Sequence, residues 1–155
     1  MPSSTKLRWS HFYRMADIIP PGESGNVKID HFMITKDTFQ GFQVEQTAPG
    51  EYARLYVGGS VMMSDTDMEL RTNYHAVRDA RGDVFIGGLG LGMITLPILK
   101  KPEVTSVTVV ELNPHVIALV EPSLRKAAGP DAQKLTVIEG DVKTWRPEVR
   151  KLKRR

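Results

Sequence analysis

The order of apolar and polar residues divides the chain into a β-rich first part and an alternating second part. Apolar-rich runs at residues 27–34, 42–46 and 52–63 are interrupted by Ala48-Pro49-Gly50 and, within the last run, by Gly58-Gly59. β-Branched and aromatic residues within these runs are typical of strands, and short breaks of this kind connect antiparallel neighbours. We therefore predict a small antiparallel β meander at 27–64, inside an N-terminal β-rich extension at 1–64.

From residue 65 onward, helical and strand patterns alternate. Potential capping residues at 64–67 precede a helical pattern that ends near Gly82. Short apolar runs and helical runs then follow one another, which predicts a parallel sheet with right-handed crossovers at 65–145. Strands are expected at 83–86, 106–110 and 135–138, with helices at 91–101 and 113–128 between them. The predicted fold class is α/β, with a Rossmann-like parallel sheet after the small antiparallel subdomain.

Two prolines interrupt the expected helices of this second part. Pro97 and Pro122 each lie inside a helical run, where the missing N–H should kink or shorten the helix.

The positive charge of the chain is concentrated at one end. The 155 residues carry a formal net charge of +3, whereas residues 146–155 alone hold six Lys or Arg and one Glu, a net +5. The other 145 residues therefore sum to −2. We interpret 146–155 as a solvated basic tail, and the charge of the rest disfavours nucleic-acid binding.

Several classes of protein are disfavoured by what the sequence does not contain. There is no Cys, which excludes disulfides and thiolate metal sites. The four His residues lack ligand spacing, so no metal is expected. No apolar run approaches the roughly 18 residues that a membrane span needs, and the start lacks a signal-peptide pattern. We expect a cytoplasmic protein without a membrane segment.

Glycines are concentrated in the turn that follows the strand 83–86. A dinucleotide fingerprint from Gly88 needs Gly at position 93, and a phosphate-binding P-loop needs Lys there, but the residue is Met93. The remaining pattern, G-x-G-x-G at Gly88, Gly90 and Gly92, is the form that this turn takes in S-adenosylmethionine enzymes. A tight turn without a ligand is the alternative interpretation.

Two carboxylates follow the next two predicted strands. Glu111 ends the second strand, at the edge where open α/β sheets bind ligands, and its carboxylate can accept hydrogen bonds from ribose hydroxyls. Asp141 has the matching place after the third strand, where it can accept from an adenine amino group while the Val142 N–H reaches a ring nitrogen. The alternatives are a solvated strand-end acid for Glu111 and a helix cap for Asp141.

These motifs resemble the cofactor-binding half of the class I S-adenosylmethionine-dependent methyltransferases, in the spermidine synthase-like branch. The matching segments are VFIGGLGLGM (84–93), VTVVELNPHVI (107–117) and LTVIEGDV (135–142). The upstream run LYVGGSVMMSDTDMELRTNYHAV resembles the β-hairpin and Tyr-His segment of spermidine synthases, so the likeness covers about residues 52–142. The resemblance implies a truncated methyltransferase fold.

The resemblance also implies roles for individual residues around S-adenosylmethionine. Tyr74 and His75 match a Tyr-His pair near the reacting end of the site, which makes His75 a candidate base and Tyr74 a candidate substrate contact. A structural role for this pair in the core is the alternative. The implied cofactor-binding residues are Gly88, Gly90 and Gly92 at the methionine portion, Glu111 at the ribose with Asn113 beside it, and Asp141 with Val142 at the adenine.

Two departures from the spermidine synthase pattern affect the expected activity. Those enzymes carry an Asp in the glycine loop where this chain has Gly90, and a catalytic Asp after a fourth strand that the pattern here does not predict. Polyamine synthesis is therefore disfavoured, and a methyltransferase of unknown acceptor is expected. The alternatives are a non-catalytic cofactor-binding or interaction module, an aminopropyltransferase-like enzyme, or a different nucleotide binder.

A sheet that lacks a fourth strand leaves the strand 83–86 with an open edge. We therefore expect the chain to self-associate through this strand or through the β meander.

Overall fold

The structure, a computed structural model, describes residues 12–35 and 48–145, and it confirms the predicted α/β class. Two sheets are present in the described part of the chain, one antiparallel and one parallel. The predicted strand at 42–46 and the basic tail at 146–155 lie outside the described residues.

The first sheet is an antiparallel meander in the order β1-β2-β3-β4, as predicted for this part of the chain. Its long central pair joins β2 and β3 in register over eight residues, from Val27 opposite Val57 to Ile34 opposite Gly50. Strand β1 was not predicted, because it follows directly after two prolines that indicated a turn. The strands span Gly22–Ser24 (β1), Val27–Ile34 (β2), Gly50–Val57 (β3) and Ser60–Ser64 (β4).

The second sheet is parallel, in the order β5-β6-β7. Each of its strands is one to three residues longer than the strand predicted from the sequence. They span Gly82–Gly87 (β5), Val104–Glu111 (β6) and Leu135–Glu139 (β7), and a short 3₁₀ helix η2 (Gly129–Lys134) leads into β7. Because all three strands run the same way, their carboxyl ends meet at one edge of the sheet.

Helix α3 leads from the antiparallel sheet into β5, and α4 and α5 connect the parallel strands. The prolines affect α4 and α5 differently. Helix α3 spans Asp67–Asp79, α4 is only Thr95–Leu99, and α5 spans Pro114–Ala128. The predicted helix at 91–101 is thus reduced to five residues, in agreement with the expected effect of Pro97. Helix α5 in contrast continues through Pro122. Val120 and Leu124, one on each side of this proline, are fully buried in the hydrophobic core and anchor the helix there.

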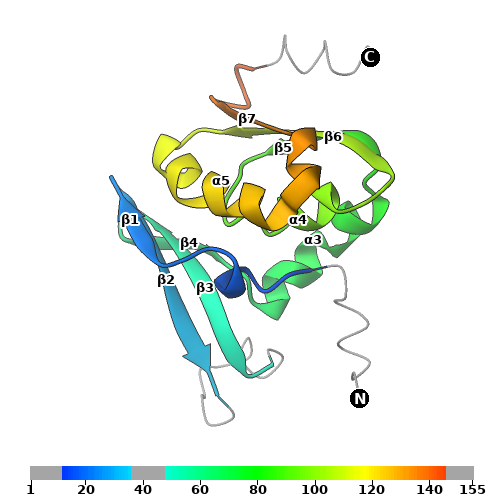
Figure 1. The fold of residues 1–155 in the computed structure, drawn as a ribbon. Coiled ribbons are helices and arrows are strands. Elements are labelled where there is room, and N and C mark those ends of the chain that lie inside the picture. Colours follow the sequence, from blue (N-terminus) through cyan, green and yellow to red (C-terminus); the bar gives the residue numbers. More distant parts are fainter. Residues whose placement is uncertain (1–11, 36–47, 146–155) are drawn as a thin grey trace.

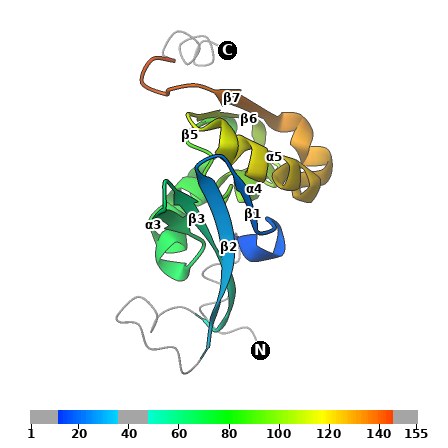
Figure 2. The ribbon, with the colours of Figure 1, turned by 90° about the vertical axis from the view of Figure 1, so that its left-hand side faces the viewer.

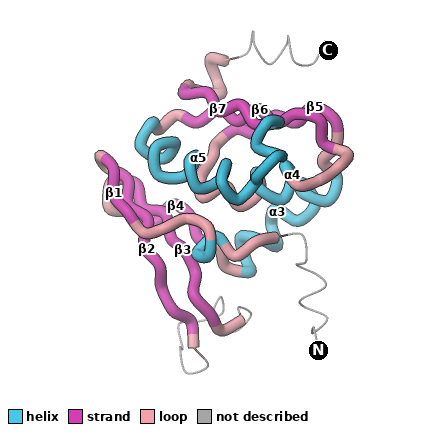
Figure 3. Tube along the Cα trace, in the orientation of Figure 1, coloured by secondary structure: helices cyan, strands magenta, loops and turns pink. Residues whose placement is uncertain are grey.

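One hydrophobic core joins the two sheets. The helices lie on a single face of the parallel sheet, and the antiparallel sheet lies beyond them (Figures 1 and 3). The view turned by 90° shows the same arrangement, with the long β2–β3 pair extending away from the parallel sheet (Figure 2). Fully or almost fully buried residues from both sheets and from α5 share this core, among them Ile29, Leu55, Val107, Val109 and Val120.

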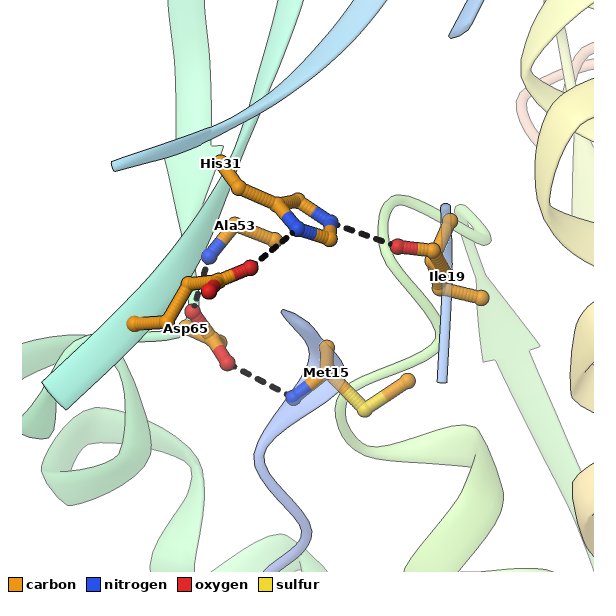
Figure 4. Close-up of polar contacts among 6 residues, drawn as sticks. Met15, Ile19, His31, Ala53 and Asp65 are labelled. Atoms are coloured by element: carbon orange, nitrogen blue, oxygen red, sulfur yellow. Dashed lines mark hydrogen bonds and ion pairs between the residues drawn. The ribbon is translucent and has the colours of Figure 1, made fainter. Parts of the chain in front are cut away.

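A buried carboxylate connects the antiparallel sheet to the chain before it (Figure 4). Asp65 is only 2% exposed, and its two oxygens accept hydrogen bonds from the backbone N–H groups of Met15 (2.7 Å) and Ala53 (2.8 Å). Nearby, the ring nitrogens of His31 lie 2.7 Å from Glu51 Oε1 and 2.7 Å from the Ile19 carbonyl oxygen. Asp65 therefore stabilises the entry to α3 through long-range contacts rather than as a cap of that helix.

The outer face of the parallel sheet carries the turn that follows β7. Trp145 stacks on Phe85 of β5, with ring centroids 5.7 Å apart and planes 11° apart. Among the described strands, β5 pairs with β6 alone, so its other edge is open as predicted. The self-association expected from this edge stays a prediction.

Candidate functional site

The glycine loop between β5 and α4 adopts the conformations that glycine permits. Gly88, Gly90 and Gly92 have φ angles of 102°, 52° and 73°, a region that strains residues with a Cβ. A Cβ on Gly88 would meet no heavy atom within 4 Å, whereas a Cβ on Gly92 would lie 3.0 Å from Leu124 Cδ1. Gly88 therefore presents bare backbone to open space, and Gly92 allows α5 to approach the loop.

Glu111, at the carboxyl end of β6, is bound to this loop. Its Oε1 accepts hydrogen bonds from the N–H groups of Leu89 (2.9 Å) and Gly90 (3.5 Å). Its Oε2 accepts from the N–H of Asn113 at 2.9 Å. A carboxylate has about four lone-pair sites, so a half-buried Glu111 with three N–H partners keeps acceptor capacity for a ligand hydroxyl.

Asn113 links Glu111 to helix α5. It is the N-cap of that helix, and its Oδ1 accepts a hydrogen bond from the His115 N–H at 2.9 Å. Cap residues of this type stabilise a helix start by satisfying an otherwise unpaired N–H. Asn113 and Glu111 are thereby held in a fixed relation at the same edge of the parallel sheet.

A cavity of about 500 Å³ lies at this edge, within the size range of small-molecule sites. Four of the predicted site residues line it: Gly88, Gly90, Glu111 and Asn113. The antiparallel sheet supplies one wall, and this wall was not predicted from the sequence. It is formed by the side chains of Leu55, Val57, Met62 and Met63.

Asp141 and Val142 follow β7 at the same edge of the parallel sheet but do not line the cavity. Asp141 Oδ1 accepts from the Lys143 N–H (2.9 Å), and its carbonyl oxygen accepts from the Thr144 N–H (3.0 Å), so Asp141 caps a turn. The alternative considered for this residue was a helix cap, and the described residues after Asp141 form a turn rather than a helix. Val142 is 41% exposed and lies beside Gly87, the last residue of β5, where a Cβ would be 3.3 Å from the Val142 Cγ2. A role of either residue at an adenine stays a prediction.

The Tyr-His pair lies on α3 and is not part of the cavity lining. His75 is exposed and Tyr74 is half-buried, with their ring centroids 5.6 Å apart. The residue before them, Asn73, does line the cavity. The proposed roles of Tyr74 and His75 stay predictions, and Asn73 is a site residue that the sequence patterns did not indicate.

Outside the cavity, the described residues contain one deeply buried carboxyl group and no metal-binding cluster. Burial raises the pKa of Asp65, which is part of the junction in Figure 4 and not of the cavity. Residues 12–35 and 48–145 contain no cluster of three or more His, Asp or Glu arranged to hold a metal ion. In the same residues no helix is long and apolar enough to cross a bilayer.

Comparison with curated proteins finds polyamine aminopropyltransferases from two strains of Mycobacterium tuberculosis and one of Mycobacterium bovis. Each is 30% identical to this chain over 108 residues, which is 66% of the chain and 21% of the relative. The chain thus matches about a fifth of the length of these curated relatives. No family model matches it.

The solved structures that resemble this chain include two spermidine synthases, each 19% identical. One is from Thermotoga maritima, with a TM-score of 0.48 over 79% of this chain and 40% of that chain. The other is in complex with the transition state analogue AdoDATO, with a TM-score of 0.45 over 78% of this chain and 40% of that chain.

The curated relatives distinguish between the methyltransferase and the aminopropyltransferase classes that the sequence left open. The curated relatives are aminopropyltransferases rather than methyltransferases, so the likeness to the spermidine synthase branch is supported and methyl transfer is not.

Proposed function

We propose that this chain forms the adenosine-binding part of an aminopropyltransferase-like site, with decarboxylated S-adenosylmethionine as the donor. The observation that carries the proposal is the bonding of Glu111 to the glycine loop. A strand-end carboxylate with spare acceptor capacity lies beside bare backbone at Gly88, and both face a cavity of about 500 Å³. This combination is typical of nucleoside sites at the carboxyl edge of an open α/β sheet.

Each part of the nucleoside has a candidate partner in the site. Glu111 would accept hydrogen bonds from the ribose hydroxyls, and Asn113 would lie beside it. The bare backbone at Gly88 would allow the 5′ substituent to approach the main chain. Apolar side chains of β3 and β4 would exclude water from one side of the ligand.

The donor supplies a carbon activated for attack by an amine. The amine forms a C–N bond to the aminopropyl carbon, the C–S bond breaks with its electron pair going to sulfur, and the amine loses a proton. The products are a lengthened polyamine and neutral 5′-methylthioadenosine. Since the chain matches only 21% of its relatives' length, the described residues are assigned nucleoside binding and not the proton transfer.

Calorimetric titration with decarboxylated S-adenosylmethionine tests the proposal. We expect binding by the wild-type chain and a loss of about tenfold or more in affinity for Glu111→Gln, because a charged acceptor becomes a neutral one. Glu103→Gln is the matched control, since Glu103 is an exposed residue before the opposite end of the same strand. Absence of binding by the wild-type chain, or equal affinities for both variants, contradicts the proposal.

The class of transfer is tested by the nucleoside product. With a diamine as acceptor, aminopropyl transfer releases 5′-methylthioadenosine from the decarboxylated donor. Methyl transfer from S-adenosylmethionine would instead release S-adenosylhomocysteine. Chromatographic detection of the second product alone would favour the methyltransferase expectation and contradict the aminopropyl assignment.

A further inference from the structure

Of the described residues that line the cavity, three carry nitrogen or oxygen in their side chains: Asn73, Glu111 and Asn113. Both oxygens of Glu111 accept hydrogen bonds from backbone N–H groups. The amide of Asn113 is used at both ends, because its Oδ1 accepts from the His115 N–H and its Nδ2 donates to Asn26 Oδ1. Asn73 is the remaining polar side chain of the lining.

The side-chain amide of Asn73 has a defined orientation on α3. Its Nδ2 donates to the Glu69 carbonyl oxygen at 2.8 Å. Exchanging the amide nitrogen and oxygen would set two acceptors against each other, so this carbonyl fixes which end of the amide is the oxygen. Among the side-chain nitrogen and oxygen atoms of the described lining, Asn73 Oδ1 is therefore the one without a hydrogen bond to a described residue.

A ligand that fills the cavity changes the surroundings of this oxygen. Asn73 is half-buried, so water can reach Oδ1 until a ligand displaces it. An amide oxygen that loses water without gaining a donor weakens binding, whereas a donor on the ligand replaces the lost hydrogen bond. The neighbouring side chains of β3 and β4 supply no donor, and the sulfur of Met63 is itself an acceptor, bonded to the Leu91 N–H at 3.2 Å.

We infer that Asn73 Oδ1 accepts a hydrogen bond from an N–H group of the bound nucleoside, which makes Asn73 a specificity-determining residue of the site. This inference rests on the proposed function, which assigns the ribose hydroxyls to Glu111 and leaves a nitrogen donor for Asn73. Decarboxylated S-adenosylmethionine carries two such donors, the 6-amino group of adenine and the ammonium group of the aminopropyl chain. A nucleoside that lacks the bonded nitrogen should bind more weakly.

Calorimetry on the full chain tests this with three nucleosides. They are decarboxylated S-adenosylmethionine, 5′-methylthioadenosine, which lacks the ammonium group, and the 6-deamino analogue of 5′-methylthioadenosine. Each is titrated into wild type and into Asn73→Leu, whose side chain has a similar branched shape without the acceptor. Removal of one of the two nitrogen groups should lower the affinity of wild type about fivefold more than it lowers the affinity of Asn73→Leu. The nucleoside pair that shows this difference identifies the bonded group.

Two further variants separate the acceptor from the packing of α3. Asn73→Asp keeps an oxygen acceptor and should keep the dependence on the same nitrogen group. Thr72→Val is the matched control, because the Thr72 hydroxyl donates to the same Glu69 carbonyl at 2.9 Å but Thr72 does not line the cavity. Thr72→Val should bind all three nucleosides as wild type does. Cooperative thermal unfolding verifies that each variant is folded, and Asn73→Ala takes the place of Asn73→Leu if the latter does not fold.

The outcomes distinguish this inference from the proposed function. Equal losses of affinity in wild type and Asn73→Leu, for both nitrogen groups, overturn the inference and leave the proposed function standing. A folded Thr72→Val that behaves like Asn73→Leu also overturns it, because the cause is then the packing of α3. If none of the three nucleosides binds the wild-type chain, the proposed function fails and this inference fails with it.

Discussion

The side chain of Asn26, in the turn between β1 and β2, is hydrogen bonded to the side chain of Asn113, with Asn113 Nδ2 donating to Asn26 Oδ1 at 3.2 Å. A second contact lies beside it, because Ser24 Oγ is 2.9 Å from His115 Nδ1. The first hairpin of the antiparallel sheet thus contacts the start of α5, next to Glu111. The candidate site therefore depends on both sheets, although its motif belongs to the parallel one.

Asn113 has two separable roles, and two substitutions distinguish them. Asn113→Ala removes both the cap of α5 and the bond to Asn26, so it should reduce the free energy of unfolding by about 1 kcal/mol. Asn113→Asp keeps an acceptor for the His115 N–H and loses the donor to Asn26, so it should cost less than half as much. Urea denaturation measures both values, and equal losses would contradict the capping role.

The close approach of Met63 to Gly90 predicts an energetic coupling between these positions. Gly90→Ala should destabilise the chain by about 1–2 kcal/mol, through the positive φ angle and the overlap with the Met63 sulfur. In a Met63→Ala background the overlap is gone, so the cost should fall by at least about 0.5 kcal/mol. Chemical denaturation of the two single variants and the double variant gives this difference.

Gly88 provides the matched control for that cycle. It also has a positive φ angle, but a Cβ there meets nothing within 4 Å. Gly88→Ala should therefore cost the same in the wild-type chain and in the Met63→Ala background. Equal coupling at both glycines would show that the contact with Met63 is not the cause.

The buried carboxyl group of Asp65 should make the free energy of unfolding depend on pH. Burial raises the pKa of this carboxyl in the folded chain above its ordinary value of about 3.9. Between the two values the folded chain binds more protons than the unfolded chain, so stability falls as pH rises through this range. Its stabilising contribution is complete below about pH 3.9 and is lost as pH passes the raised pKa.

Other carboxyl groups titrate in wild type and in Asp65→Asn alike. The difference between the free energies of unfolding of the two proteins, measured at each pH, therefore reports the contribution of Asp65. The advantage of the wild-type chain should be largest at low pH and should decrease toward neutral pH. Asp65→Asn also loses one of the two N–H acceptors, to Met15 or Ala53, at a cost of about 1–3 kcal/mol that does not depend on pH. A difference that is constant across the pH range would contradict the raised pKa.

Among the strands that the structure describes, β5 has one unpaired edge, and unpaired strand edges pair readily with other strands, so we expect this chain to self-associate. Sedimentation velocity over a roughly hundredfold range of protein concentration should show a species larger than the monomer, whose fraction rises with concentration. A monomer at every concentration would contradict this prediction.

Local patterns were sufficient for most of the fold. The order of elements from α3 to β7 follows from alternating apolar runs and from glycines that permit only certain turns, and these are properties of neighbouring residues. The exceptions were β1, which pairs with β2 despite the preceding prolines, and the continuation of α5 through Pro122. In both cases packing with distant residues outweighs the local preference.

The candidate site was predictable only where its residues lie at strand ends. Gly88, Gly90, Glu111 and Asn113 follow parallel strands, so topology alone brings them to one edge. Met63 was not predicted, because its strand belongs to the other sheet and its contact with the loop exists only after the two sheets pack. The same limit applies to α3. The sequence indicated Tyr74 and His75, but Asn73 is the α3 residue that lines the cavity, and the cavity exists only after the two sheets pack.

The central claim is that the Glu111 carboxylate binds ribose hydroxyls, and a cycle of protein and ligand changes tests it most directly. Calorimetry compares 5′-methylthioadenosine with its 2′,3′-dideoxy analogue, on wild type and on Glu111→Gln. If the hydroxyls bind Glu111, losing them should cost wild type at least about 1 kcal/mol more binding free energy than it costs Glu111→Gln. The dideoxy analogue should then bind both proteins almost equally. Additive effects, in which losing the hydroxyls costs Glu111→Gln as much affinity as wild type, would contradict the account.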